Sequence, residues 1–425
     1  MAYERTVLTA AAALLLFAGG VVAGVNNWLP ARLFKTAMVT AGEIRTYAEA
    51  AIFAFPNQHT RPRRGPGDGV TLSDPAAMQP GVTLVSGLFG QVLGFRLMAA
   101  DGTILHEWPV NFFTLAPEEM NHRYHALIHG EMMFPNGDII ANLDGRRLVR
   151  FDHCGRMLWQ TPAKPHHSVF LDENGLVWTP TGATPYPPNG IVGFPYSMDR
   201  IGAFDAETGK QVAEVSLSDS FHDLNHPGLL QPNPANADDL LHTNDVEVLS
   251  AAMAPAFPMF RARDILISSR NLHQLWVLDG TTHQIKWTYA GAMRGQHDPD
   301  FEPDGTISVF DNRATGEPTA ENGYLGALGG SRIVAIDPAT GKERVLYASD
   351  ADNSFYSPFR GKHQMLANGN ILITETDGGH VFEVTRQGRV VWSFINGWDK
   401  DHVGWVMGAT RYPESFAAAA MAPCT

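Results

Sequence analysis

The sequence predicts an all-β fold, a six-bladed β-propeller that follows an N-terminal transmembrane or amphipathic helical segment. One sheet-like pattern recurs six times beyond residue 80, and most copies open with an Asn-Gly or Asp-Gly turn. Such turns, flanked by β-branched and aromatic residues, are strong hairpin signals. The repeat interval of roughly 40 to 65 residues favours a propeller over a sandwich, because the whole unit repeats. The sequence lacks the helix–strand alternation that is typical of parallel α/β folds.

The composition is that of a folded, turn-rich protein with a large core. Hydrophobic residues make up 44% of the 425 residues and charged residues only 18%, with 41 glycines and 28 prolines. This balance argues against a disordered chain. The formal net charge is −13, and no run of Lys or Arg rivals a nucleic-acid-binding patch. We therefore expect no nucleic-acid partner.

The N-terminal segment predicts a membrane anchor. Thr6 to Leu29 is uncharged and mostly apolar, and its apolar core is about as long as a bilayer requires. Residues 33–55 space their apolar side chains as an amphipathic helix does. We expect residues 1–56 to form an anchor and a juxtamembrane helix that hold the rest of the chain across the membrane. A cleaved secretory signal, with a weak site at residues 21–23, is the alternative.

Residues 57–80 are rich in Pro, Gly and Arg and predict a linker, and residues 81–425 predict the propeller. Residues 402–416 carry one more strand pattern without a partner of its own. We expect this strand to close the ring by pairing with the first blade, which leaves no open sheet edge. The six copies of the pattern begin at Gly90, Pro135, Glu173, Arg263, Pro303 and Ala367.

Histidines recur at a similar point of the pattern. Four lie six or eight residues before the glycine of a turn, and a fifth lies in the copy that lacks the first turn. Because the first strand of each blade lines the channel, we expect all five to converge on one axis. The alternative is that each histidine is hydrogen-bonded within its own blade. The five residues are His129, His167, His242, His297 and His363.

Converging imidazoles suit nucleophilic chemistry. Buried histidines that face one another repel when protonated, so their pKa values should fall and leave neutral nitrogens at pH 7. A metal site is the alternative use, because two groups of histidines have spacings that could chelate an ion. Carboxylates at matching places are scarce, apart from Asp298 and Asp300. We expect no metal. The chelating groups are His122, His125 and His129, and His222 with His226 in a Pro-rich loop.

Other side chains fit an anionic aromatic substrate. Arg313 ends ISVFDNR just after the His297 strand, and a fixed guanidinium there would bind the planar oxygens of a sulfate or phosphate ester. A surface charge is the alternative. Phe355, Tyr356 and Trp178 could stack on an aryl group, or pack in the core. Lys362 is expected to point outward along its strand.

Four stretches resemble the arylsulfate sulfotransferase family: LHTNDVEVL with DILISSRN, GQHDPDFEPDGTISVFDNR, FYSPFRGKHQMLANGNILITET and HHSVFLDENGLVWT. The resemblance extends over Gly81 to Pro413. It implies a periplasmic six-bladed propeller that transfers a sulfuryl group from an aryl sulfate to a phenol without a nucleotide donor or other cofactor. It also implies that His363 is the transiently sulfated nucleophile, and that His242, His297 and Arg313 hold the sulfuryl oxygens.

The resulting hypothesis is a sulfotransferase anchored to the periplasmic side of the inner membrane. His167, His129 and Tyr356 are the expected substrate-binding residues. A homodimer and a partner within a membrane complex both stay open, as does the pairing of Cys154 with Cys424. The alternatives are a non-catalytic scaffold on the same fold and, with less support, a quinone- or metal-dependent propeller enzyme.

Overall fold

The computed structural model describes residues 59–111, 115, 127–188, 192–222 and 234–424, together with residues 16, 17, 19, 20 and 22. The expected anchor and juxtamembrane helix otherwise lie outside the described residues. Within the described part, no helix has the length and apolar character needed to cross a membrane.

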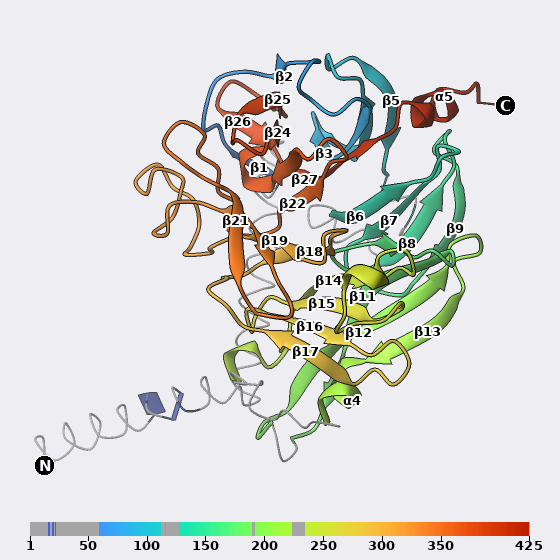
Figure 1. The fold of residues 1–425 in the computed structure, drawn as a ribbon, viewed down its shortest axis with the longest axis vertical. Coiled ribbons are helices and arrows are strands. Elements are labelled where there is room, and N and C mark those ends of the chain that lie inside the picture. Colours follow the sequence, from blue (N-terminus) through green and yellow to red (C-terminus); the bar gives the residue numbers. More distant parts are fainter. Residues whose placement is uncertain are drawn as a thin grey trace, which may run out of the picture.

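Six antiparallel sheets are arranged around a central channel, as the repeats predict (Figure 1). The first blade comprises β27 (Val406–Tyr412), β3 (Val82–Phe89), β4 (Val92–Met98) and β5 (Ile104–Pro109). The second comprises β6 (Ile128–Met133), β7 (Ile139–Leu143), β8 (Arg147–Phe151) and β9 (Met157–Thr161). The third comprises β10 (Phe170–Leu171), β11 (Leu176–Tyr186), β12 (Tyr196–Asp205) and β13 (Gln211–Ser216).

The remaining blades follow the same order from channel to rim. The fourth comprises β14 (Thr243–Val248), β15 (Ile265–Ser269), β16 (Gln274–Leu278) and β17 (Ile285–Tyr289). The fifth comprises β18 (His297–Phe301), β19 (Ile307–Asp311), β20 (Arg332–Ile336) and β21 (Glu343–Ala348). The sixth comprises β22 (Lys362–Met365), β23 (Ile371–Glu375), β24 (His380–Val384) and β25 (Val390–Ile395).

Among the described residues from 59 onward, the helical elements are short and lie in loops. They are α4 (Leu217–His222), α5 (Ser415–Ala420) and the 3-10 turns η3 (Pro234–Asn236), η4 (Ala254–Ala256) and η5 (Thr376–Gly378).

The ring closes through the C-terminal strand, as predicted. β27 pairs antiparallel with β3, with Tyr412 opposite Val82, so the last strand of the chain becomes the innermost strand of the first blade. This pairing removes the exposed edge that an open ring would leave.

The segment expected as a linker contributes two strands. β1 (Thr60–Pro62) pairs with β26 (His402–Gly404), and β2 (Gly69–Ser73) pairs with β25 of the sixth blade. β2 covers the outer edge of that blade, and Val70 packs against the local core. The segment therefore forms an arm that extends the sixth blade.

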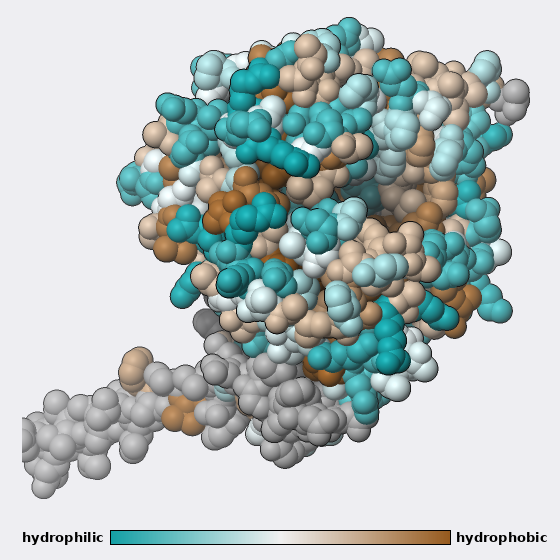
Figure 2. All heavy atoms as spheres, in the orientation of Figure 1, coloured by the Kyte–Doolittle hydropathy of each residue, from teal (hydrophilic) through white to brown (hydrophobic). Residues whose placement is uncertain are grey.

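The core lies between the blades. β7, β15, β19 and β23 are buried along their whole length, because both faces of each blade lie against a neighbour. Leu84 of the first blade and Ile139 of the second share one apolar cluster. On the outer surface, hydrophilic and hydrophobic residues are interspersed over the face seen in Figure 2.

A disulfide joins Cys154, in the turn between β8 and β9, to Cys424 near the C-terminus, with Cα atoms 5.7 Å apart. The pairing that the sequence left open is therefore made. It fastens the tail next to α5, whose Ala417 and Ala420 pack into the core of the first two blades.

Removing this disulfide should lower thermal stability. A cross-link over a long loop stabilises a protein by typically about 2–4 kcal/mol, because it restricts the unfolded chain. We expect the Tm of a Cys154→Ser/Cys424→Ser double variant, measured by scanning calorimetry, to fall by several degrees. A reducing agent should lower the wild-type Tm similarly and leave the variant unchanged. Equal Tm values for wild type and variant would contradict the prediction.

Candidate functional site

Four histidines from consecutive blades gather at one end of the channel. His129 lies in β6, His167 precedes β10, His242 precedes β14 and His297 begins β18. The ring of His167 is central: its centroid lies 4.0 Å from that of His129, 4.8 Å from that of His242 and 6.3 Å from that of His297. We call these four residues the histidine cluster.

Irregular backbone at the strand starts aims these side chains inward. The pairing register shifts in β6, β14 and β18, next to His129, His242 and His297. Such bulges re-aim side chains next to functional sites. His167 and His242 also have φ values of 59° and 49°, a left-handed conformation that costs a non-glycine residue about 1–3 kcal/mol. The surrounding fold therefore enforces the cluster.

Carboxylates determine which ring nitrogen carries the proton in two histidines. The Nδ1 atom of His129 lies 2.9 Å from Oδ1 of Asp144, and Nδ1 of His242 contacts the carboxylate of Asp239. Since an ionised carboxylate only accepts hydrogen bonds, each Nδ1 carries the proton. The Nε2 atom of each ring is then left with its lone pair.

His167 has the opposite tautomer. Its Nδ1 lies 2.9 Å from Nδ1 of His166. Burial opposes the charged form of His166, but the carboxylate of Asp199 outweighs it and raises the pKa of His166 to about 9. The charged His166 donates to His167, which therefore keeps its own proton on Nε2.

Burial and nearby positive charge favour the neutral form of three of the cluster histidines. Burial lowers the pKa of His129, even though Asp144 acts in the other direction. Burial and then the charges of neighbouring histidines hold the pKa of His167 well below its usual value. Burial and the nearby Arg270 do the same for His297. Neutral imidazoles near pH 7 are what nucleophilic or proton-transfer chemistry requires.

His297 holds the loop that carries Arg360 through a hydrogen bond to the backbone of that residue. Its Nδ1 donates to the carbonyl of Gly295 (2.9 Å) and to Oδ1 of Asn312 (2.8 Å). Its Nε2 accepts the backbone N–H of Arg360 at 3.2 Å. Both nitrogens of His297 are therefore engaged.

Two cations complete the site. A cavity of about 20 Å³, room for about one water molecule, is lined by His129, His167 and His297 and by Arg360 and Lys362. The guanidinium carbon of Arg360 lies 4.1 Å from the ring centroid of Trp405. The histidine cluster, Arg360 and Lys362 together are called the channel site.

Lys362 points into the channel rather than outward. Its Nζ lies 3.7 Å from Oδ1 of Asp298. Although burial disfavours the charged form, Asp298 and further channel carboxylates raise the pKa of Lys362. The ammonium group therefore stays charged beside the cavity.

His363 lies outside the cluster. Its side chain is fully buried, with Nδ1 3.1 Å from Oδ2 of Asp298 and Nε2 2.7 Å from Oγ of Ser308. β22 keeps regular pairing from Lys362 to Met365, so consecutive side chains alternate in direction. It is Lys362 that lines the cavity.

The structure also separates other predicted residues from the cavity. Arg313 follows β19 and is not among the residues that line the cavity, where Arg360 stands instead. Tyr356 is fully buried; its hydroxyl accepts from the N–H of Thr315 and donates to the carbonyl of Gly316. His122, His125 and His226 lie outside the described residues, as does the side chain of His222.

Sequence reasoning missed Arg360 because it belongs to a loop and not to a repeated strand position. Its φ of 61° is unusual for a side-chain-bearing residue. The only sequence signal was its place two residues before Lys362, in the segment FRGKHQML.

Two carboxylates, those of Asp245 and Asp298, also line the cavity. Burial and the charge of Asp298 raise the pKa of Asp245 to about 7, and burial raises the pKa of Glu131. Among the described residues, three sets of side chains have ligand atoms within 4.8 Å of one another, and the disulfide between Cys154 and Cys424 leaves two sets that could hold a metal ion. They are His129, Asp144 and His167, and Asp298, Asp300 and His363.

Comparisons with known proteins give one family and several distant structures. The family model described as Arylsulfotransferase (ASST) matches residues 130–397, more than half of the chain. No curated protein matches.

A protein of unknown function from Bacteroides caccae is 12% identical over 78% of this chain and 98% of its own, with a TM-score of 0.49. Virginiamycin B lyase from Staphylococcus aureus is 12% identical over 64% and 70%, with a TM-score of 0.36. TolB from Acinetobacter baumannii is 11% identical over 77% and 66%, with a TM-score of 0.43.

Proposed function

This chain belongs to the arylsulfotransferase family, and from that premise we propose that it moves a sulfuryl group from an aryl sulfate to a phenol through a sulfohistidine. The observation that carries the proposal is the channel site, where neutral histidines face Arg360 and Lys362. Sulfuryl transfer, like phosphoryl transfer, requires alignment and stabilisation of charge on the transferred oxygens. Imidazoles and fixed cations supply both.

His129 is the nucleophile that the hydrogen bonds favour. Its Nδ1 proton is held by Asp144, so Nε2 has a free lone pair next to the cavity. His242 has a similar arrangement but does not line the cavity. The family resemblance points instead to His363, whose two nitrogens are both bonded between blades. We therefore propose that His129, and not His363, forms the covalent intermediate.

The reaction has two steps, transfer of the sulfuryl group to His129 and then to the acceptor phenol. Nε2 of His129 attacks sulfur and the bond from sulfur to the aryl oxygen breaks. The departing phenolate takes the Nε2 proton of His167, while the charged His166 passes its Nδ1 proton to Nδ1 of His167, so that His167 stays neutral. Arg360 and Lys362 stabilise the charge on the sulfuryl oxygens, and His297 and Asn312 hold the Arg360 loop. In the second step the acceptor phenol gives its proton to Nε2 of His167, which returns its Nδ1 proton to His166, while the phenol oxygen takes the sulfuryl group from His129.

The pH dependence of kcat should be a plateau between two limbs. His129 must be neutral to attack, and its pKa is lowered by burial, so the acid limb should lie below pH 6.5. His166 must stay charged to hold the tautomer of His167, and its pKa is about 9, so activity should fall as pH rises through that value. His166→Gln should lose the alkaline limb. An acid limb centred above pH 6.5 in a kcat profile would contradict the assignment.

Two further proposals concern location. The apolar segment Thr6 to Leu29 supports an anchor in the inner membrane with the propeller on the periplasmic side, and the Cys154–Cys424 disulfide fits an oxidising compartment. We expect the N-terminal peptide of the mature protein, isolated from membranes, to include residues 6–29. A mature N-terminus near Gly24 in mass spectrometry would overturn the anchor. A homodimer or a membrane-complex partner is compatible with either outcome.

A non-catalytic scaffold is the second candidate, because the cavity of about 20 Å³ is smaller than an aryl sulfate. On the proposed function, one sulfuryl oxygen enters it and the rest of the donor stays at the mouth. Turnover of p-nitrophenyl sulfate with a phenol acceptor, assayed with the full chain, separates the two candidates. Absence of turnover across a broad panel of donors would favour the scaffold.

A further inference from the structure

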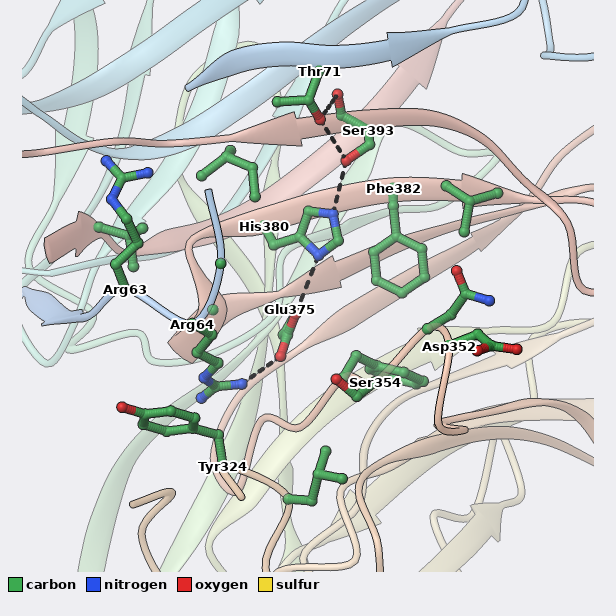
Figure 3. A pocket seen from close by; sticks show the side chains of 18 of the residues that line it. Arg63, Arg64, Thr71, Tyr324, Asp352, Ser354, Glu375, His380, Phe382 and Ser393 are labelled. Carbon is green, nitrogen blue, oxygen red and sulfur yellow. Dashed lines mark hydrogen bonds and ion pairs between the residues drawn. The ribbon is translucent and has the colours of Figure 1, made fainter. Parts of the chain in front are cut away.

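A second cavity, of about 460 Å³, lies where the N-terminal arm meets the last two blades (Figure 3). Arg63 and Arg64 of the arm, Tyr324 of a fifth-blade loop, and His380 and Ser393 of the sixth blade contribute to its wall. None of its lining residues is shared with the channel cavity. Its volume suits a small organic ligand. We call it the arm cavity.

A chain of hydrogen bonds crosses the wall of the arm cavity, as Figure 3 shows. The Oγ atom of Ser393 lies 3.0 Å from Nε2 of His380, and Nδ1 of His380 lies 3.2 Å from Oε2 of Glu375. The Thr71 hydroxyl donates to Oγ of Ser393 at 3.1 Å. Serine, histidine and carboxylate in this order form the arrangement that activates a serine nucleophile.

The sheet register produces this order. β24 and β25 are antiparallel with Phe382 opposite Ser393, so His380, two residues earlier, is a diagonal neighbour of Ser393 on the same face. The imidazole of His380 stacks on the Phe382 ring at 4.7 Å with an interplanar angle of 18°. The base is therefore held in one orientation.

Glu375 fixes the tautomer of the base. Its side chain is 4% exposed and forms an ion pair with Arg64, and it accepts the backbone N–H of Tyr356 at 2.8 Å. These contacts stabilise the ionised carboxylate, which can only accept the Nδ1 proton of His380. Nε2 of His380 is then the acceptor for the hydroxyl proton of Ser393.

The arm cavity also offers donors for negative charge. Within the described part of the chain, Nε of Arg63 and Nη2 of Arg64 are buried without a hydrogen-bond partner. Buried donors of this kind are rare and point to a ligand, and guanidinium groups stabilise an oxyanion or an acidic substituent. Leu72, Phe355 and Val390 add apolar surface.

We propose that Ser393, His380 and Glu375 form a second catalytic site that hydrolyses small carboxylic esters, with preference for esters that carry an anionic or aromatic group. Oγ of Ser393 attacks the carbonyl carbon while His380 takes its proton. The bond to the alkoxy oxygen breaks, and the alcohol leaves with that proton. Water, deprotonated by His380, then releases the acid from the acyl-serine. The site is independent of sulfuryl transfer in the channel.

A fluorophosphonate probe tests the proposal on the full chain. We expect the wild type to be labelled on the peptide that contains Ser393, and to hydrolyse p-nitrophenyl butyrate. Ser393→Ala should abolish labelling, and His380→Gln should reduce both labelling and hydrolysis at least about 100-fold. Ser354→Ala, a serine in the same wall, should keep wild-type labelling.

Aryl sulfate turnover provides the folding control, because Ser393 lies outside the channel site. It should stay at the wild-type level in Ser393→Ala, and the Tm of that variant should stay close to the wild-type value. Ester hydrolysis or labelling that survives in a folded Ser393→Ala variant would overturn the proposal. So would a wild type that shows neither labelling nor hydrolysis above the buffer rate.

Discussion

Replacing His129 with asparagine is expected to reduce kcat for aryl sulfate turnover by at least about 10³-fold, because the change removes the nucleophile. An asparagine keeps a similar volume and a hydrogen-bonding contact with Asp144, but its amide has no nucleophilic nitrogen. The rate is measured with p-nitrophenyl sulfate under saturating phenol. The Tm of the variant should stay close to the wild-type value, since Asp144 is partly exposed and keeps a donor.

His363→Asn is the matched control. His363 is fully buried between Asp298 and Ser308, so this change should lower the Tm while the folded fraction keeps measurable kcat. Full activity of the His129 variant together with complete loss in a folded His363 variant would reverse the assignment. It would return the covalent step to the residue that the family resemblance indicates.

Replacing Arg360 with lysine is expected to lower kcat by roughly 10²- to 10³-fold, the usual effect of removing one donor that stabilises transition-state charge. Lysine keeps the charge but loses the planar fork that can hold two oxygens at once. It also loses the stacking of the guanidinium on Trp405. The KM for the donor should change less than kcat, because the lost contacts strengthen as sulfur is transferred.

Arg313→Lys separates the two arginines. Arg313 is not part of the cavity lining, so its variant should keep activity within a few-fold of the wild type. If Arg313→Lys proved as damaging as Arg360→Lys, the sulfuryl oxygens would be held further toward the channel mouth than the cavity geometry indicates.

The sequence predicts the repeated parts of this structure well. The turn-strand pattern led to six blades, and the unpaired strand at residues 402–416 led to ring closure through β27. The recurrent offset of histidines led to three residues that share one end of the channel, His129, His167 and His297, because equivalent strand positions face equivalent directions. His242, from the copy without the first turn, joins them, whereas His363 has the offset and lies outside the cluster. These features depend on periodicity, which a single sequence displays directly.

Features that depend on local irregularity could not be predicted. The pairing register shifts in β6, β14 and β18 beside His129, His242 and His297, whereas β22 pairs regularly and turns Lys362 inward and His363 away. Nothing in the repeat distinguishes the two cases. Arg360 lies in a loop. The hydrogen-bonded chain of Ser393, His380 and Glu375 depends on cross-strand register and on Thr71 of the arm, which lies 322 residues from Ser393 in the sequence. Such contacts arise only from the three-dimensional fold, and a single sequence does not display them.

Trapping the covalent intermediate decides which histidine carries the sulfuryl group. The wild type is incubated with p-nitrophenyl sulfate in the absence of acceptor, digested under conditions that preserve sulfohistidine, and analysed by tandem mass spectrometry. We expect one sulfuryl group on the wild-type peptide that contains His129. This group should be lost when phenol is added, and it should be absent from the same peptide of the His129→Asn variant. A sulfuryl group on the His363 peptide instead, or phenol release with no modified histidine, would contradict this expectation.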